Sequence, residues 1–334
     1  MKALVYTGLQ KLIYREEKDP IEIPGESIIK VKASGICGSD MHAYHGKDDR
    51  RNAPLILGHE VSGTSQNGKF KNQTVVLNPL ITCEECCYCK SNKEHLCPQR
   101  TMVGMSKPIQ REGGLAEYIS IPNKNIHIIS ETLDIKEAAL SEPIAVCVHA
   151  VSISKKNSEK PLSECTVLIQ GAGAIGLLCG LILSKVENCK KIVMSDPNKL
   201  RLDECSKYLK AKFVNPASKE LNENGFDLVF DTVGLEVSRQ QAIHTTAPGG
   251  LIVHVGLTQP EGIFNFRKLT IQEITVVGTY CYTKKDFKLA IDFLTNKKLG
   301  SLNWIEYRAL KKGPEAFKQI HNGSCVAPKI ILIP

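Results

Sequence analysis

Residues 166–196 read TVLIQGAGAIGLLCGLILSKVENCKKIVMSD, and this stretch decides the fold. The apolar run TVLIQ predicts a buried strand, GAGAIG predicts a tight turn, and LLCGLILSK predicts an apolar helix. KIVMSD then predicts a second buried strand. A strand, a glycine turn, a helix and a further strand in this order are typical of a parallel, doubly wound α/β sheet.

Three glycines of the turn, Gly171, Gly173 and Gly176, have the spacing G-x-G-x-x-G. The first glycine allows the tight turn, the second lets a pyrophosphate approach the backbone, and the third lets helix and strand pack closely. The helix that begins at Ala174 and Ile175 would present free N–H groups to phosphate. A glycine turn without a ligand is the alternative, but the complete strand–turn–helix–strand context favours a dinucleotide site.

Asp196 ends the second strand of this unit. An acidic side chain at this position accepts hydrogen bonds from the adenosine ribose and repels a 2′-phosphate, so the sequence predicts NAD rather than NADP. Arg201, in the helical stretch that follows, fits either a contact with the adenine side or a solvated helix face.

Strands and helices keep alternating after this stretch, whereas the chain before residue 140 shows short strands, glycine turns and weak helical periodicity. The polar segment 154–164 is interpreted as a connection between the two regions. Periodicity leaves open whether the tail of the chain extends the sheet or returns to the N-terminal region. Further strands are expected at 226–234, 251–257, 274–281 and 329–334, and helices at 198–210, 238–247, 284–296 and 313–323.

The length of 334 residues suits two domains, and 42% hydrophobic with 23% charged residues is an ordinary globular composition. The net charge of +8 is spread among acidic residues, which favours an ordinary basic surface over a nucleic-acid footprint. No apolar run reaches the roughly 18 residues of a membrane span. The first residues read as a strand rather than a signal peptide, so we expect a cytoplasmic protein without a membrane or nucleic-acid partner.

Five of the thirteen cysteines lie between Cys83 and Cys97. Four of them have the spacing C-x2-C-x2-C-x7-C, which predicts one tetrahedral structural zinc with no open position. Local disulfides or a redox motif are the alternatives, and both are disfavoured in a chain without a secretory signal. Cys87 either stands beside the cluster or shifts its register, and we favour the bystander. The predicted ligands are Cys83, Cys86, Cys89 and Cys97.

A second, dispersed set consists of Cys37 in GICGSDMH, His59 and Glu60 in LGHE, and Glu142 in SEPIAVCVHA. A thiolate, an imidazole and one or two carboxylates suit a zinc ion with an exchangeable position. From spacing alone these could equally be unrelated buried residues.

These motifs carry a family likeness, together with LGHEVSG, REGGLAEYISIP and GAGAIGLL. The chain resembles the zinc-containing medium-chain dehydrogenases, especially the sorbitol-like polyol dehydrogenase branch, over nearly its whole length. The resemblance implies a β-rich GroES-like catalytic domain formed by 1–145 and 282–334, and a Rossmann domain at 146–281. It also implies a homodimer or homotetramer that uses NAD and two Zn²⁺ per chain, one catalytic and one structural.

The resemblance assigns roles at the catalytic zinc. Cys37 and His59 would be ligands, and Glu60 stands where this branch often has a ligand. Glu142 would ligate the metal or hold its water, and Ser39 and His42 would relay the proton. The implied reaction oxidises a secondary alcohol of a polyol or sugar alcohol to a ketone. Candidate substrate-pocket residues are Tyr44, His45 and Tyr280.

One departure bears on the substrate: Thr279 stands where sugar-alcohol members carry an arginine before the retained Tyr280. A simple alcohol, a vicinal diol, a phosphorylated polyol or threonine therefore stay open, as does a non-catalytic zinc-stabilised binding protein. Lys47, Arg50 and Arg51 would suit a phosphate, but we favour a solvated charged loop.

Overall fold

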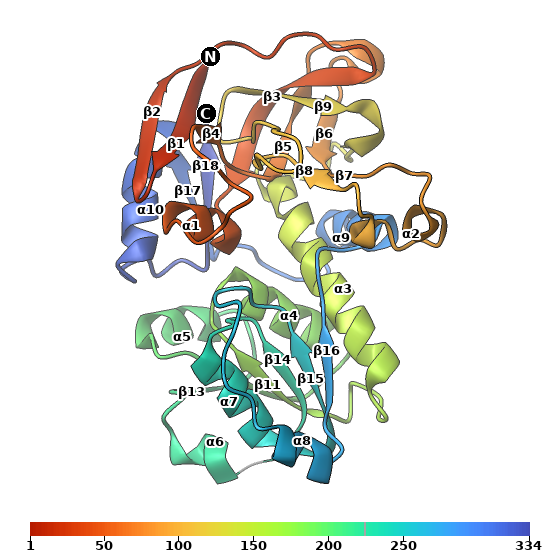
Figure 1. The fold of residues 1–334 in the computed structure, drawn as a ribbon, viewed down its shortest axis with the longest axis vertical. Helices are drawn as coiled ribbons and strands as arrows, with labels where there is room; N and C mark the ends of the chain where they lie inside the picture. Colours follow the sequence, from red (N-terminus) through yellow and green to blue (C-terminus); the bar gives the residue numbers. More distant parts are fainter. Residues whose placement is uncertain (224) are drawn as a thin grey trace.

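The computed structural model describes residues 1–223 and 225–334, and it contains two α/β bodies joined by a long helix, α3 (Ser141–Asn157) (Figure 1). Both chain termini lie in the same body, the upper one in Figure 1. The expected fold class, a GroES-like domain with a Rossmann domain, is confirmed. No described helix is at once long enough and apolar enough for a membrane crossing.

The lower body is a six-stranded sheet in the order β13-β12-β11-β14-β15-β16, with every pair parallel. The chain order reverses between β11 and β14, and in such sheets ligands bind beyond the carboxyl ends of the strands at this point. The strands are β11 (Thr166–Gln170), β12 (Lys191–Ser195), β13 (Lys212–Val214), β14 (Phe226–Asp231), β15 (Thr246–His254) and β16 (Thr275–Gly278). Its helices are α4 (Ala174–Lys185), α5 (Lys199–Ser206), α6 (Lys219–Glu223), α7 (Glu236–Thr245) and α8 (Phe266–Ile271).

The upper body is built on a seven-stranded sheet, with a three-stranded and a two-stranded sheet beside it. Its main sheet has the order β10-β6-β5-β3-β18-β17, and β9 also pairs with β3. Its elements are β1 (Lys2–Gly8), β2 (Lys11–Glu16), β3 (Glu26–Gly35), α1 (Gly38–Tyr44), β4 (Leu55–Ile56), β5 (Glu60–Ser65), β6 (Thr74–Leu77), β7 (Leu80–Ile81), α2 (Cys87–Lys90), β8 (Thr101–Met102), β9 (Tyr118–Pro122), β10 (Ile126–Ile128), β17 (Ile305–Ala309), α10 (Gly313–His321) and β18 (Lys329–Ile333).

The C-terminal tail rejoins the upper body, which periodicity alone had left open. Strand β18 is antiparallel to β3, with Ile331 opposite Gly35 and Leu332 opposite Ser34. Helix α9 (Lys284–Thr295) leads the chain back and packs against α3. A capping box between Thr283 and Asp286 fixes its start.

Helix α3 was not expected in full, because the polar segment 154–164 had been interpreted as a connection. The helix continues to Asn157, and the expected domain boundary at 145/146 falls inside it. One cluster of buried apolar side chains runs through α3, α4 and α9 and reaches both sheets. This shared core holds Glu142, in the first turn of α3, at a fixed place between the two bodies.

Candidate active site and zinc centres

The fold brings Cys37, His59 and Glu60 together. Cys37 precedes α1, and His59 and Glu60 lie at the start of β5. One ligand atom from each lies within 4.8 Å of the others. Ligands of a tetrahedral zinc stand about 3.6 Å apart for bonds of about 2.0–2.3 Å, so the set fits a zinc ion. Burial raises the pKa of the Cys37 thiol, and the binding of a cation would favour its thiolate form.

Asp40 organises this set, although the sequence analysis did not identify it. Its carboxylate accepts a hydrogen bond from the Cys37 amide at 3.0 Å, and its other oxygen lies 3.6 Å from His59 Nδ1. A carboxylate behind a histidine orients the ring so that Nε2 faces the metal. Nδ1 of His59 has no hydrogen-bond partner within the described residues, so Asp40 is the acid placed to receive its proton.

Glu60 is engaged by a lysine from the far end of the chain. Lys329 Nζ lies 2.6 and 2.8 Å from the two carboxylate oxygens and 2.9 Å from the carbonyl oxygen of Ile36. Both side chains are buried. Although burial opposes the charged form, Glu60 raises the pKa of Lys329 above its ordinary value. Glu60 is therefore paired with Lys329 while one of its oxygens also lies within the candidate ligand set.

Glu142 faces the same site from α3. It lines a cavity of about 220 Å³ together with Cys37 and His59. Burial raises the pKa of Glu142 to about 8. Its carboxyl group lies outside the three-residue set formed by Cys37, His59 and Glu60.

Ser39 and Arg51 form a polar pair beside His59. Arg51 Nη2 donates to Ser39 Oγ at 3.1 Å, and Ser39 Oγ lies 3.4 Å from His59 Nε2. Arginine can only donate hydrogen bonds, so Ser39 accepts here and its own proton points elsewhere. The expected relay partner, His42, lines the cavity, and burial lowers its pKa.

Two sequence interpretations are corrected here. Arg51 is not on a solvated loop: it is 2% exposed, because its guanidinium bonds Asp48, the Gly104 carbonyl and Ser39. Tyr44 and His45 lie away from the cavity. Tyr44 is buried against Phe317, and His45 forms a 2.8 Å hydrogen bond with His321.

The cavity is also lined by Thr279, Tyr280 and Cys281, which follow β16. Tyr280 is therefore placed where the sequence analysis expected it. The guanidinium of Arg100 lies 5.0 Å from the centre of the Tyr280 ring. The hydroxyl of Thr279 is buried without a hydrogen-bond partner in the described residues.

A second cavity, of about 730 Å³, surrounds the glycine turn. A Cβ on Gly176 would stand 1.9 Å from the Gly171 carbonyl oxygen, whereas a Cβ on Gly173 would meet nothing within 4 Å. The space in front of Gly173 is where a pyrophosphate would approach the backbone, so the turn fits a dinucleotide. The cavity is also lined by Ala174, Ile175, Asp196 and Arg201.

Asp196 holds this turn in shape. Its carboxylate accepts hydrogen bonds from the amides of Ala172 and Asn198, both at 2.8 Å. Arg201 donates weakly to the carbonyl of Cys325 at 3.4 Å. Asp196 therefore lies at the end of β12, where it lines the cavity and accepts hydrogen bonds from two backbone amides.

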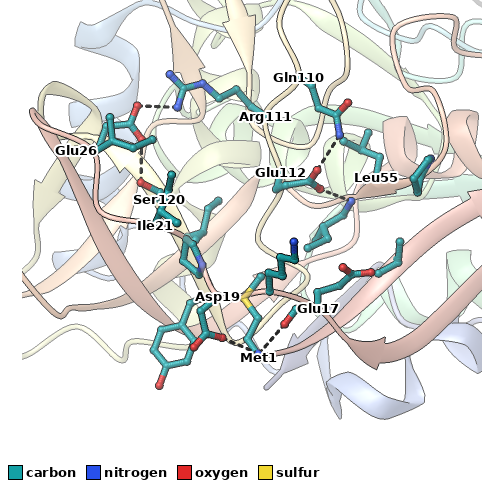
Figure 2. Close-up of a pocket in the computed structure, with 18 of the residues that line it drawn as sticks. Met1, Glu17, Asp19, Ile21, Glu26, Leu55, Gln110, Arg111, Glu112 and Ser120 are labelled. Carbon is teal, nitrogen blue, oxygen red and sulfur yellow. Dashed lines mark hydrogen bonds and ion pairs between the residues drawn. The ribbon is translucent and has the colours of Figure 1, made fainter.

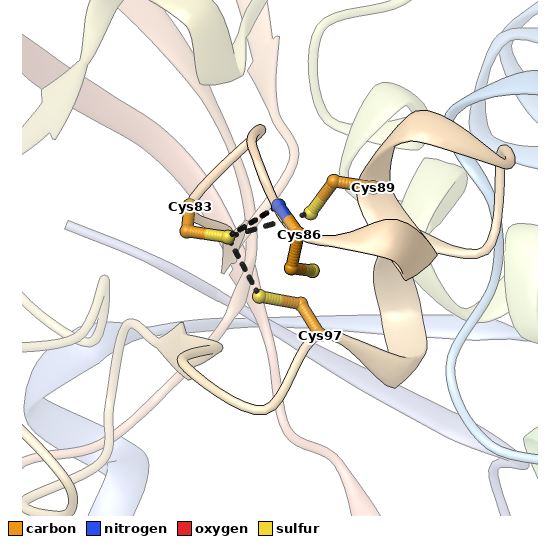
Figure 3. A group of neighbouring side chains, drawn as sticks. All are labelled: Cys83, Cys86, Cys89 and Cys97. Atoms are coloured by element: carbon orange, nitrogen blue, oxygen red, sulfur yellow. Dashed lines mark hydrogen bonds between the residues drawn. The ribbon is translucent and has the colours of Figure 1, made fainter.

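The four cysteines of the upper body converge on one point (Figure 3). Their sulfur atoms lie within 4.8 Å of one another, with Cys83 3.5 Å from Cys97 and 3.9 Å from Cys89. These distances exceed the disulfide bond length of about 2.05 Å and suit a shared metal. The Cys86 amide donates to Cys83 and lowers the pKa of that thiol. Cys87 is exposed and lies outside the set, as the bystander interpretation expected.

A further hollow of about 460 Å³ lies in the upper body (Figure 2). Its charged groups bind one another: the amino group of Met1 is 2.6 Å from Asp19, and Arg111 is 2.6 Å from Glu26. Glu112 accepts from the amide of Ile56 at 2.7 Å. This internal pairing stabilises the hollow's rim and does not single out a ligand.

Comparison with known proteins agrees with this architecture. Residues 23–131 match the model of the alcohol dehydrogenase GroES-like domain, and residues 174–296 match that of the zinc-binding dehydrogenase. The chain belongs to the zinc-containing medium-chain dehydrogenases, and it is a zinc-dependent, NAD(P)-linked oxidoreductase.

Within that family, its relatives include enzymes of polyols and sugar acids. The chain is 30% identical to a probable D-xylulose reductase A of Aspergillus clavatus, covering 96% of this chain and 94% of the relative. It is also 30% identical to the L-galactonate-5-dehydrogenase of Escherichia coli, covering 86% and 85%. The crystal structure of L-idonate 5-dehydrogenase from Escherichia coli superposes with a TM-score of 0.86 at 26% identity, covering 100% and 98%.

Proposed function

We propose that this enzyme oxidises a secondary alcohol of a polyhydroxylated substrate to a ketone, with NAD as the hydride acceptor. The observation that carries the proposal is that the two cavities share five lining residues. Cys37 and His59 line one cavity and the glycine turn lines the other, so an alcohol and a nicotinamide bound there would meet where the two cavities adjoin. Residues lining both are Gly38, Ile175, Thr232, Val233 and Thr258.

Cys37 and His59, with Glu60 or Glu142, would hold a zinc ion that acts as a Lewis acid and lowers the pKa of the substrate hydroxyl. NAD bound at the glycine turn would supply the hydride acceptor. Water would be excluded from the space between the zinc ion and NAD by the side chains of Val146, Val233 and Val255. A second zinc would be held by the four cysteines and would stabilise their loop.

The chain's own polar groups then manage the substrate proton. Ser39, whose oxygen accepts from Arg51, would take the proton of the alcohol and pass it toward His42. The lowered pKa of His42 keeps it neutral at pH 7, so it is ready to accept. The positive charge of Arg51 beside Ser39 favours the deprotonated alcohol.

NAD is proposed over NADP because Asp196 stands at the end of β12 and lines the dinucleotide cavity. The relatives' names favour polyols and sugar acids as substrates. A simple alcohol, a vicinal diol, a phosphorylated polyol and threonine are the alternative substrates to be tested beside them.

The experiment is a panel of these alcohols with NAD, followed by NADH absorbance, on wild-type protein and on Cys37→Ser. The matched control is Cys87→Ser, which removes an exposed thiol outside both clusters. The proposal expects polyol-dependent NADH formation that Cys37→Ser abolishes and Cys87→Ser preserves. Normal turnover by Cys37→Ser would overturn it.

We also propose a homodimer or homotetramer. Strand β16 is the last strand of the parallel sheet, and three of its residues, Thr275, Val276 and Gly278, are exposed. An edge of this kind is open to pairing with a second copy. Sedimentation velocity of wild-type protein and of Val276→Lys would test this: the variant should shift toward the monomer, and a wild-type monomer would refute the proposal.

A further inference from the structure

The cavity lined by Cys37 and His59, the alcohol cavity, is also lined by cationic side chains. Arg50 and Arg51 both line this cavity, and Glu142 is the one carboxylate among its described lining residues. Asp48 neutralises only one of the two arginines, because it is the shared partner of both. The arginine pair therefore carries a net positive charge into a cavity meant for a small polar molecule.

Arg51 and Arg50 differ in whether all of their guanidinium nitrogens have hydrogen-bond partners. Every guanidinium nitrogen of Arg51 has a partner: the Gly104 carbonyl, Asp48 or Ser39. Arg50 bonds Asp48 through Nε at 2.9 Å and Nη2 at 3.1 Å, and its side chain is 39% exposed. Within the part of the chain that the structure describes, Nη1 of Arg50 has no hydrogen-bond partner. Asp48 thus holds the Arg50 guanidinium in place and leaves one nitrogen free.

The surroundings of Arg50 suit a charged ligand group. Tyr280 and Thr279 line the same cavity, and Arg100 lies against the Tyr280 ring as a further nearby cation. A neutral hydroxyl would be stabilised only weakly by the positive charge of Arg50, whereas a carboxylate or phosphate forms short, charge-assisted hydrogen bonds with a guanidinium.

We propose that the substrate carries an anionic group, a carboxylate or a phosphate, away from the reacting hydroxyl, and that Arg50 binds this group. The inference rests on the proposed function and narrows its substrate class to acidic polyols. The zinc-ligand set would then hold one end of the substrate and Arg50 the other, which orients the reacting carbon.

The test compares three substrate types with NAD: hexonates, hexitol phosphates and neutral hexitols of matched configuration. Wild-type kcat/KM should favour one anionic type over the hexitols at least tenfold. Arg50→Gln should lower kcat/KM for that type by about ten- to hundredfold, the cost of one charge-assisted contact, and change the hexitol value less than threefold. Arg50→Lys should fall between, because it keeps the charge but not the fork. The anionic substrate type with the higher kcat/KM, hexonate or hexitol phosphate, shows whether the bound group is a carboxylate or a phosphate.

The matched control is Lys47→Gln, which removes one exposed positive charge from the same loop outside the cavity lining and should leave the preference unchanged. Binding is also measured by thermal shift on the NADH complex. The preferred anion should raise the Tm of wild type, and Arg50→Gln should lose most of that rise. The variant keeps its loop, because the Arg50 carbonyl still accepts from the amides of Ser106 and Lys107.

Equal use of hexitols and anionic substrates by wild type, or an equal effect of Arg50→Gln on both, would overturn this inference and leave the proposed function standing. Should Arg50→Gln fail to fold, an Arg50→Lys variant with unchanged preference and unchanged thermal shift would overturn it as well. If none of the three substrate types reduces NAD, the proposed polyol oxidation fails together with the inference.

Discussion

The buried ion pair of Lys329 and Glu60 makes a quantitative prediction. Lys329→Met would leave the Glu60 carboxylate buried without its partner, since both side chains are at most 3% exposed. Breaking a buried pair on one side costs about 3–5 kcal/mol. An unfolding entropy of about 2.1 cal/mol/K per residue over 334 residues gives about 0.7 kcal/mol/K. Cooperative unfolding would then lower the Tm by about 4–7 °C.

The assay is thermal unfolding of protein whose exchangeable zinc has been removed, for wild type, Lys329→Met, Glu60→Gln and the double variant. The double variant should recover most of the loss, because it buries no unpaired charge. Adding zinc should also restore part of the loss in Lys329→Met, since the freed carboxylate then faces a cation.

The control is Lys207→Met, which breaks a surface pair with Glu204 and should leave the Tm nearly unchanged, because solvent screens such pairs. The reasoning is refuted if Lys329→Met without zinc is as stable as this control, or if the double variant is no better than the single one.

Three further predictions concern the other sites. Cys89→Ser should lose the tightly held zinc and lower the Tm, whereas Cys87→Ser should keep both; metal analysis and calorimetry check this, and equal behaviour would contradict the four-cysteine site. Asp196→Asn should lower the ratio of kcat/KM for NAD over NADP by at least tenfold, and an unchanged ratio would remove the basis for NAD preference. Burial lowers the pKa of His42 below its ordinary 6.5, so kcat/KM should fall only as the pH drops below that value, where His42 becomes protonated. His42→Gln should abolish this acid limb, and an identical limb in the variant would assign it to another group.

The sequence predicted those parts of the structure that depend on local pattern. The glycine turn was recognisable because its strand, turn and helix are contiguous, and the four cysteines because they lie in one loop. The extent of α3 was underestimated because its last turn is polar and resembles a linker. The placement of the tail was undecided because β18 pairs with β3, nearly three hundred residues away in sequence.

The residues that support the site could not be predicted from the sequence, because their contacts also join segments that are far apart in the chain. Nothing local to Lys329 indicates that it meets Glu60, since only the tertiary fold joins them. Arg51 was interpreted as solvated because charged residues in loops usually are, and burial against Gly104 reverses that expectation. The contact of Asp40 with Cys37 could have been predicted from the sequence, because a carboxylate three residues after a candidate ligand can accept a hydrogen bond from that ligand's amide.

The most direct measurement is anomalous diffraction at the zinc edge from crystals grown with NADH. We expect two peaks per chain, one within bonding distance of Cys37 and His59 and one among the four cysteines, with the nicotinamide ring beside the first. A single peak at the cysteine cluster, or a nicotinamide ring outside the cavity that Cys37 lines, would contradict the proposed hydride transfer.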